Sequence, residues 1–149
     1  MIRIQRVNNE NLDFQELVRL LDAELAERDG AEHAFYAQFN GIETLDKVIL
    51  LFEGEQAVAC GAFKPFDAQS IEIKRMYVRA GQRGKGYAGK VLAALEEWAR
   101  DLGYTRTVLE TGKRQYEALG LYQKHQYERI ENFAPYVGIA NSLCFAKPL

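Results

Sequence analysis

The chain has few of the residues that commonly hold metals or form covalent intermediates. Its 149 residues include two cysteines, Cys60 and Cys144, and two histidines, His33 and His125. Neither pair has the short ligand spacing of a zinc site, so no metal site is predicted. Both cysteines stand in apolar, strand-like stretches, and the chain shows no signal-peptide pattern. We therefore expect reduced, packed thiols and a cytoplasmic protein in which neither cysteine is catalytic.

Long apolar segments and an excess of one charge are also missing. No apolar run approaches the roughly 18 residues that a membrane-spanning helix needs, so no membrane association is predicted. The formal net charge of −2 gives no basic surface of the kind that nucleic-acid binding requires. Repeats, low-complexity stretches and linkers are absent. With 48% hydrophobic and 27% charged residues, the chain is predicted to form a single globular domain over residues 1–149.

The chain does contain a regular succession of apolar patterns. Alternating or continuous apolar runs predict strands at 2–7, 48–52, 57–64, 70–78, 105–111, 127–131 and 143–147. Helical spacing predicts helices near 13–29, 31–39, 87–102 and 115–124. Strands come first, and a strand–helix–strand–helix–strand order follows. This order predicts an α/β (α+β) fold with a central mixed sheet of six to seven strands and about four flanking helices.

The predicted strand at 70–78 has an irregular alternation. Ile71 and Ile73 lie on one face, whereas Met76 and Val78 fall on the opposite phase. A β-bulge shifts the side-chain phase by one residue in this way, although a strand buried on both faces would hide its phase. A bulge here would turn backbone groups of residues 76–78 outward, where a bound amide chain could pair with them.

A glycine-rich turn follows this strand directly. Residues 83–89 read Arg-Gly-Lys-Gly-Tyr-Ala-Gly, and an amphipathic helix begins at Tyr87. The unpaired N–H groups and the dipole at a helix start favour anions, and glycines let the backbone approach them closely. The segment therefore predicts a phosphate-bearing ligand, although a tight turn that packs helix against strand would use the same residues.

Two widespread phosphate-binding motifs fit this turn poorly. Residues 81–88 have the two glycines of a P-loop but end in Tyr-Ala, where Lys and then Ser or Thr belong. Nucleoside triphosphate hydrolysis therefore has little support. The glycines of 83–89 do have the spacing of the dinucleotide fingerprint, with Glu110 at about the place of its acid. Because the fingerprint opens on the first strand of a βαβ unit, a nicotinamide cofactor is a weaker alternative.

Taken with its flanks, the turn resembles motif A of the GNAT superfamily of acyl-CoA-dependent N-acyltransferases. That motif is Arg or Gln, two residues, Gly, one residue, then Gly or Ala, and Arg83, Gly86 and Ala88 satisfy it. Residues 72–78 resemble the fourth strand of the family. Residues 118–122, Ala-Leu-Gly-Leu-Tyr, resemble its Ala-x-x-Leu-Tyr helix. The resemblance implies the GNAT fold, with acetyl-CoA as the cosubstrate.

The resemblance covers residues 48–131 and implies direct transfer of acetyl to a primary amine within a ternary complex. It implies Tyr122 as the general acid for the departing thiolate, with Tyr116 as an alternative at a different motif position. Either Glu110 or Glu72, both together, or ordered water would be the base. The residues implied to bind the cofactor are Met76, Tyr77, Val78, Arg83, Gly84, Lys85, Gly86, Tyr87, Ala88, Gly89 and Gln115.

Some of these positions carry further expectations. The resemblance implies that the N–H of Val78 stabilises the oxyanion, and Gln115 stands where many relatives have Asn. Basic residues cluster at 74–75, 83–90 and 113–114, as a polyanionic cofactor would require. Residues 125–127 read His-Gln-Tyr where relatives usually have Leu-Gly-Phe. Without that glycine, residue 126 must adopt a left-handed cap at some cost, or the helix ends differently, and the preceding His is expected to face solvent.

The sequence does not name the acceptor. The near-neutral charge and the lack of an added recognition domain slightly favour a small-molecule amine over a peptide or protein amine. Acids within residues 22–32 would attract a cationic amine, although a solvated helix surface explains them equally well. A CoA-binding module without turnover is the alternative function. The apolar closing strand could pair across a homodimer.

Overall fold

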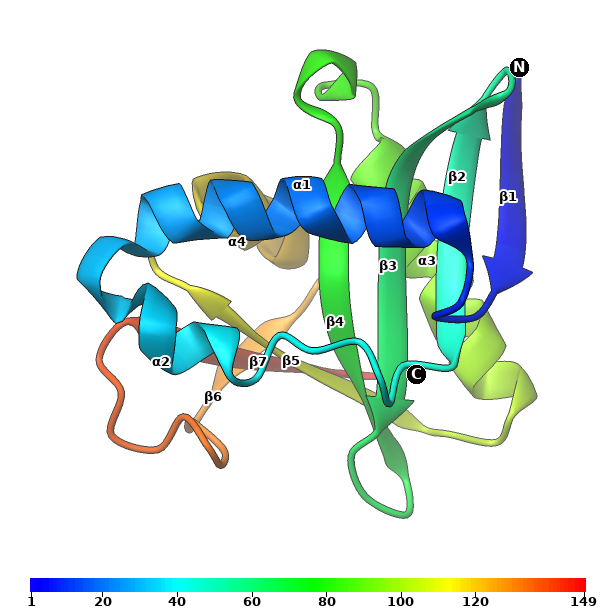
Figure 1. Ribbon diagram of the computed structural model, residues 1–149. Coiled ribbons are helices and arrows are strands. Elements are labelled where there is room, and N and C mark those ends of the chain that lie inside the picture. Colours follow the sequence, from blue (N-terminus) through cyan, green and yellow to red (C-terminus); the bar gives the residue numbers. More distant parts are fainter.

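The computed structural model describes residues 1–149, which form one seven-stranded mixed sheet in the order β1-β2-β3-β4-β5-β7-β6 (Figure 1). None of the helices combines the length and apolar character of a membrane span. The predicted α/β fold is confirmed. The elements are β1 (Ile2–Val7), α1 (Leu12–Asp29), η1 (Gly30–Glu32), α2 (His33–Ala37), β2 (Lys47–Glu53), β3 (Gln56–Pro65), β4 (Ser70–Val78), η2 (Ala80–Gln82), α3 (Tyr87–Asp101), β5 (Arg106–Gly112), α4 (Tyr116–Lys124), β6 (Glu128–Ile130) and β7 (Ser142–Pro148).

Local sequence sets the helix ends. The side chain of Asn11 accepts a hydrogen bond from the N–H of Phe14 (3.0 Å), so Asn11 caps α1. Gly30 follows α1 with a φ of 56°, a conformation that ends helices and favours glycine. After α4, Gln126 has a φ of 70°. The left-handed cap expected from the missing glycine is therefore confirmed.

Apolar layers cover both faces of the sheet. On one face α3 packs over the central strands, with Val91 and Leu95 fully buried. On the other face α1 runs across the strands, as Figure 1 shows, and buries Phe14 and Leu17 against β2 and β3. Both cysteines are buried and unbonded, as expected. A small aromatic cluster joins α2 to the segment before β7. Its members include Phe35, Tyr36, Phe39, Phe133 and Tyr136.

The bulge predicted in the strand at 70–78 is confirmed. Two residues of β4, Arg75 and Met76, lie opposite one residue of β3, Gly61, and Arg75 has a φ of 59°. The thiol of Cys60 donates to the carbonyl of Arg75 (S···O 3.4 Å), which helps to hold the irregular backbone. Because one residue is added, side chains before and after the bulge switch faces of the sheet.

β4 and β5 part just before the bulge. These parallel strands are paired only where residues 70–73 meet residues 106–109. β4 continues to Val78 and β5 to Gly112 without further pairing between them. Backbone groups of β4 that face β5 are therefore left without a strand partner next to the glycine-rich turn.

β7 lies inside the sheet and is not an edge strand. It pairs antiparallel with β5 along its whole length. On its other side β6 covers residues 144–146. Edge-to-edge pairing of this closing strand across a dimer is therefore blocked over that segment, which corrects the expected pairing. A homodimer through another surface stays a prediction.

Gly61 tests how tightly the bulge is packed against α3. A Cβ at Gly61 would lie 2.5 Å from Sδ of Met76, 2.8 Å from Cδ1 of Leu95 and 2.9 Å from Cγ1 of Val91. We expect Gly61→Ala to lower the free energy of unfolding by about 1–3 kcal/mol through overpacking, measured by urea denaturation. The control is Gly81→Ala, where a Cβ meets nothing within 4 Å. Equal midpoints for Gly61→Ala and wild type would contradict this packing.

Candidate functional site

A cavity of about 880 Å³ opens where β4 and β5 part. Its wall is formed by β4, the turn at 83–89, the start of α3, the end of β5, α4 and the C-terminal half of α1. Tyr116 is 73% exposed and lies outside this wall, so it is not placed to act there. The roles of the other residues stay predictions. Every residue that the sequence implied for the site lies on the wall: Glu72, Met76, Tyr77, Val78, Arg83, Gly84, Lys85, Gly86, Tyr87, Ala88, Gly89, Glu110, Gln115 and Tyr122.

The turn between β4 and α3 presents main-chain donors that have no partner in the chain. Gly84 and Gly86 have φ values of 84° and 80°, which glycine adopts at low cost. No side chain caps α3, and the N–H groups of residues 84–89 donate to no backbone carbonyl. They lie at the positive end of the α3 dipole, on the cavity wall. The turn therefore fits a phosphate or diphosphate group.

Two side chains of this turn are directed to β2. Nζ of Lys85 lies 3.3 Å from Oε2 of Glu53, and the hydroxyl of Tyr87 donates to the same carboxylate oxygen. Tyr87 is also packed into the apolar layer beneath α3. What these two residues offer an anion is therefore mainly their backbone N–H.

The backbone of β4 after the bulge also faces the cavity. The N–H of Arg79 donates to the carbonyl of Val58 on β3 (2.9 Å). Because successive N–H groups of a strand point to opposite edges, the N–H of Val78 points to the β5 side. No strand pairs with it there. Val78 thus offers one free donor at the point where the two strands diverge.

The arginines of the basic clusters are engaged in ion pairs, and the neutralisation of a polyanionic cofactor by these clusters stays a prediction. Each of the three basic clusters has one arginine in an ion pair with an acid of α1 or η1. These acids are therefore neither simply solvated nor open to a cationic amine. The pairs are Arg75 with Asp22, Arg83 with Glu24 (2.9 Å) and Arg114 with Glu32 (3.4 Å).

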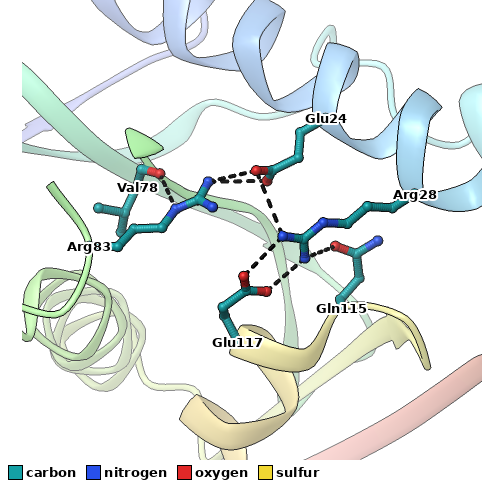
Figure 2. A network of polar contacts seen from close by, with 6 residues as sticks. All are labelled: Glu24, Arg28, Val78, Arg83, Gln115 and Glu117. Carbon is teal, nitrogen blue, oxygen red and sulfur yellow. Dashed lines mark hydrogen bonds and ion pairs between the residues drawn. The ribbon is translucent and has the colours of Figure 1, made fainter. Parts of the chain in front are cut away.

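Two of the α1 side chains form a network across the cleft, shown in Figure 2. Glu24 accepts two bonds from Arg83 (2.9 and 3.1 Å), whose Nε donates to the carbonyl of Val78 (2.9 Å). Arg28 lies 3.9 Å from Glu24. Helix α1 thereby holds the turn after β4 on one side and approaches α4 on the other.

On the α4 side Arg28 makes the contacts. It donates two bonds to Glu117 (2.7 and 2.9 Å) and one to Oε1 of Gln115 (3.3 Å), as Figure 2 shows. Bonding to Arg28 lowers the pKa of Glu117 to about 2. Nε2 of Gln115 is buried in the cavity wall and has no hydrogen-bond partner. This amide is therefore free to donate to a ligand.

Glu72 and Glu110 face the same side of the sheet, the side of α1 and α2. Ile71 and Ile73 pack in the α3 layer, so Glu72 between them points the other way. Leu109 packs in the α3 layer as well, which places Glu110 on the side of Glu72. Burial raises the pKa of Glu110 to about 7. One of its oxygens, Oε2, has no hydrogen-bond partner.

Tyr122 lies on the opposite side, within the α3 layer. Its ring packs against Tyr127 (centroids 5.6 Å apart) and Phe145 (6.3 Å), and it is 5% exposed. Burial, with a smaller effect of Glu110, raises the pKa of Tyr122. The phenol is therefore protonated at neutral pH and able to donate a proton. The cleft has this acid on one side and two carboxyl groups on the other.

Sequence reasoning left Tyr36 of α2 open between a core aromatic and a residue that borders the acceptor pocket, and it missed Tyr136. The two rings stack with centroids 6.4 Å apart and close the α2 side of the cavity. Asp29 ends α1 at 5% exposure, and burial raises its pKa. His125 is half-buried against Gly89, where a Cβ would lie 2.8 Å from Nε2, so the expected solvent-facing imidazole is wrong.

Comparison with known proteins shows the family. Residues 14–127 match the acetyltransferase (GNAT) family, and the chain belongs to that family. The resemblance seen in the sequence is thereby confirmed. The structure contains no group of three or more His, Cys, Asp and Glu side chains that could hold a metal ion.

Three curated relatives illustrate the similarity. The uncharacterised N-acetyltransferase YsnE of Bacillus subtilis (strain 168) is 38% identical over 100 residues, which are 66% of either chain. An IAA acetyltransferase of Azospirillum brasilense is 35% identical over 62% of this chain and 61% of its own. N-acetyltransferase family 8 member 2 of Rattus norvegicus is 34% identical over 53% of this chain and 34% of its own. The matches thus span about a third to two thirds of these relatives.

Solved structures match over nearly the full length. A candidate acyl-CoA N-acyltransferase of Klebsiella pneumoniae has a TM-score of 0.84 at 30% identity, covering 100% of this chain and 98% of that one. A Bacillus subtilis acetyltransferase in complex with CoA has a TM-score of 0.70 at 17% identity, covering 100% and 99%. The second likeness shows the fold alone.

The α1 network generates a prediction for Glu24. We expect Glu24→Gln to lower the free energy of unfolding by about 1–2 kcal/mol, because the half-buried guanidiniums of Arg83 and Arg28 lose their shared carboxylate. Thermal and urea denaturation measure the change. Glu27→Gln is the matched control, since Glu27 lies exposed on the same helix. A Glu24→Gln protein as stable as the control would show that the network has no net effect.

Proposed function

We propose that this chain transfers an acetyl group from acetyl-CoA to a primary amine by direct attack within a ternary complex. The cleft between β4 and β5 carries the proposal, because it has free main-chain donors at one end and an acid and bases on opposite sides. A cysteine-linked intermediate has no support. Burial raises the pKa of Cys60 to about 12 and of Cys144 to about 11, which keeps both thiols unreactive.

The backbone supplies the cofactor contacts in this proposal. The N–H groups of residues 84–89 bind the diphosphate, and the free edge of β4 at 74–78 pairs with the amide groups of the pantetheine arm. Acetyl-CoA supplies the activated thioester. The N–H of Val78 donates to the thioester oxygen as that oxygen gains charge. Gln115 adds a side-chain donor through its unpaired Nε2.

Proton transfer is divided between the two sides of the sheet. An alkyl amine with a pKa near about 10 is mostly protonated at pH 7 and must lose a proton before it attacks. Glu110, with its pKa at about 7, accepts that proton, and Glu72 lies on the same side. Tyr122 gives a proton to the departing thiolate from the other side. The amine therefore reaches the thioester from the α1–α2 side.

The aromatic side chains that close the α1–α2 side of the cleft support a small-molecule acceptor. Tyr36 and Tyr136 close it with stacked rings, and α2 lies beside them. A peptide or protein amine is the second candidate acceptor, and a CoA-binding module without turnover is the alternative function. The buried, unbonded thiols suit the cytoplasmic location that we retain as a prediction.

The hydroxyl of Tyr122 is the most direct test. Tyr122→Phe keeps the packed ring, and we expect kcat to fall at least about tenfold while CoA affinity is unchanged, because only the positioned proton donor is lost. Thiol release with a panel of amines measures kcat, and calorimetry measures CoA binding. Tyr116→Phe, outside the cavity, should behave as wild type. An unchanged kcat in Tyr122→Phe would exclude Tyr122 as the general acid. CoA binding by the wild type without thiol release from any amine would favour the non-catalytic CoA-binding module.

The pKa of Glu110 predicts a pH dependence of the reaction. If Glu110 is the base, kcat/KM of the wild type rises with pH to a plateau, with an apparent pKa of about 7. Glu110→Gln should lose this rise, whereas Glu72→Gln should keep it. An unchanged acidic limb in both variants would assign deprotonation to water.

The free energy of unfolding gives an independent test of the pKa of Glu110. The folded protein keeps a proton that the unfolded chain loses above pH 4.5, so the wild type loses stability relative to Glu110→Gln between about pH 4.5 and 7.

A further inference from the structure

The α1–α2 face of the sheet changes character along β3 and β4. Under α1 it is apolar, with Cys60 and Ala62 fully buried. Two residues beyond Ala62 the same face presents Lys64, which lies directly opposite Glu72 of β4. Lys74 follows on the same face, and its Nζ lies 3.6 Å from Oε2 of Glu72. Charged side chains thus form part of a floor that is elsewhere apolar.

These charges are buried rather than solvated. The side chains of Glu72 and Lys74 are 8% and 13% exposed. Burial lowers the pKa of Lys74, and the neighbouring charge of Lys64 adds to this effect. Nζ of Lys74 has one further protein contact, the carbonyl of Phe39 at 3.3 Å. Two lysines, Lys64 and Lys74, share this junction with two carboxyl groups, Glu72 and Glu110, and burial raises the pKa of Glu110 to about 7. Since buried charges are costly unless they are paired, the junction has room for a second anionic group when Glu110 is protonated.

A second cavity, of about 460 Å³, lies over these lysines. It shares Glu72, Lys74 and Tyr136 with the cleft cavity, so these three side chains border both spaces. Lys64 stands on its wall together with the rings of Phe39 and Phe66. Glu43, also on the wall, is exposed. The second cavity therefore combines positive charge at its junction with aromatic walls.

The register of β4 and β5 places Lys74 and Glu110 relative to each other. Glu72 pairs with Val108, so Lys74 and Glu110, each two residues further on, lie at the same level on either side of the parting strands. Paired strands lie about 4.8 Å apart, and the separation grows from there. A ligand in this gap would therefore meet a carboxyl group on the β5 side and a lysine on the β4 side.

We propose that the acceptor is an amino acid, an inference that rests on the proposed function and names its substrate class. The amine faces Glu110 and the thioester, Lys74 and Lys64 bind the carboxylate, and the side chain occupies the second cavity. In the reaction the amine nitrogen bonds the acetyl carbon and the carbon–sulfur bond breaks. Glu110 takes the first proton of the ammonium group before the attack, and Tyr122 protonates the departing thiolate. The second proton leaves the nitrogen as the amide forms and restores Tyr122, so the products are an N-acetylamino acid, CoA and the proton held by Glu110.

A cationic amine without a carboxylate is the competing acceptor. Glu72, Glu110 and Asp29 would attract it, since all three line the cleft cavity. However, Lys74 already neutralises Glu72 at the junction, and Lys64 would repel a second ammonium group. The charges of the junction therefore favour a zwitterion.

The experiment compares amino acids with the amines of the same skeleton. Thiol release is followed with acetyl-CoA and the pairs phenylalanine and phenethylamine, tyrosine and tyramine, leucine and isopentylamine, and lysine and cadaverine. We expect kcat/KM for at least one amino acid to exceed that of its paired amine tenfold or more. Lys74→Met and Lys64→Gln should each lower this ratio at least fivefold, with the KM for acetyl-CoA unchanged.

A second lysine variant and a control variant accompany Lys74→Met. Lys64 is only partly buried, so Lys64→Gln tests the site even if Lys74→Met folds poorly. Lys47→Gln is the matched control, because Lys47 pairs with Asp46 outside both cavities and should leave the ratio unchanged. Amines acetylated as fast as their amino acids, or a ratio unaffected by Lys64→Gln, would overturn the amino-acid inference and leave acetyl transfer standing. No thiol release from any acceptor would overturn the proposed function, and the inference with it.

Discussion

The loss of pairing between β4 and β5 is the constraint on which the site depends. A parallel pair in the middle of a sheet normally satisfies its backbone groups along its full length. Here pairing stops after Ile73, and the bulge at Arg75 and Met76 follows at once. The strands then diverge and leave an edge of β4 that only a ligand can pair. The glycine-rich turn lies at the end of that edge, so main-chain donors continue from the strand into the start of α3.

The arginines around this cleft form ion pairs within the protein, which join neighbouring elements. The arginines at 75, 83 and 114 are each paired with an acid of α1 or η1. Through Glu24 and Arg28, α1 links the two lips of the cleft (Figure 2). The arginines therefore contribute less to anion binding than the backbone of the turn, whose conformation depends on glycines with positive φ. Such donors need no reorganisation when a ligand arrives.

The sheet also separates the two proton-transfer groups. Side chains alternate along a strand, so β4 and β5 direct Glu72 and Glu110 to the α1–α2 side. Their neighbours Ile71, Ile73 and Leu109 pack under α3. Tyr122 belongs to the α3 layer and approaches from the other side. An acceptor and a leaving group would then meet across the thickness of the sheet. The polar floor at Lys64 extends the acceptor side beyond the cleft.

The sequence by itself determined the order of strands and helices and the glycine-rich turn, and it narrowed the β4 bulge and the left-handed cap at Gln126 to one of two alternatives each. These features follow from side-chain periodicity and from backbone conformations within a few residues, which are local. Only the tertiary structure decided that β7 lies inside the sheet, that Glu24 engages Arg83, and that Lys64 faces Glu72. Each of these depends on residues brought together from separate elements, and neither periodicity nor spacing along the chain specifies which charged partners will meet.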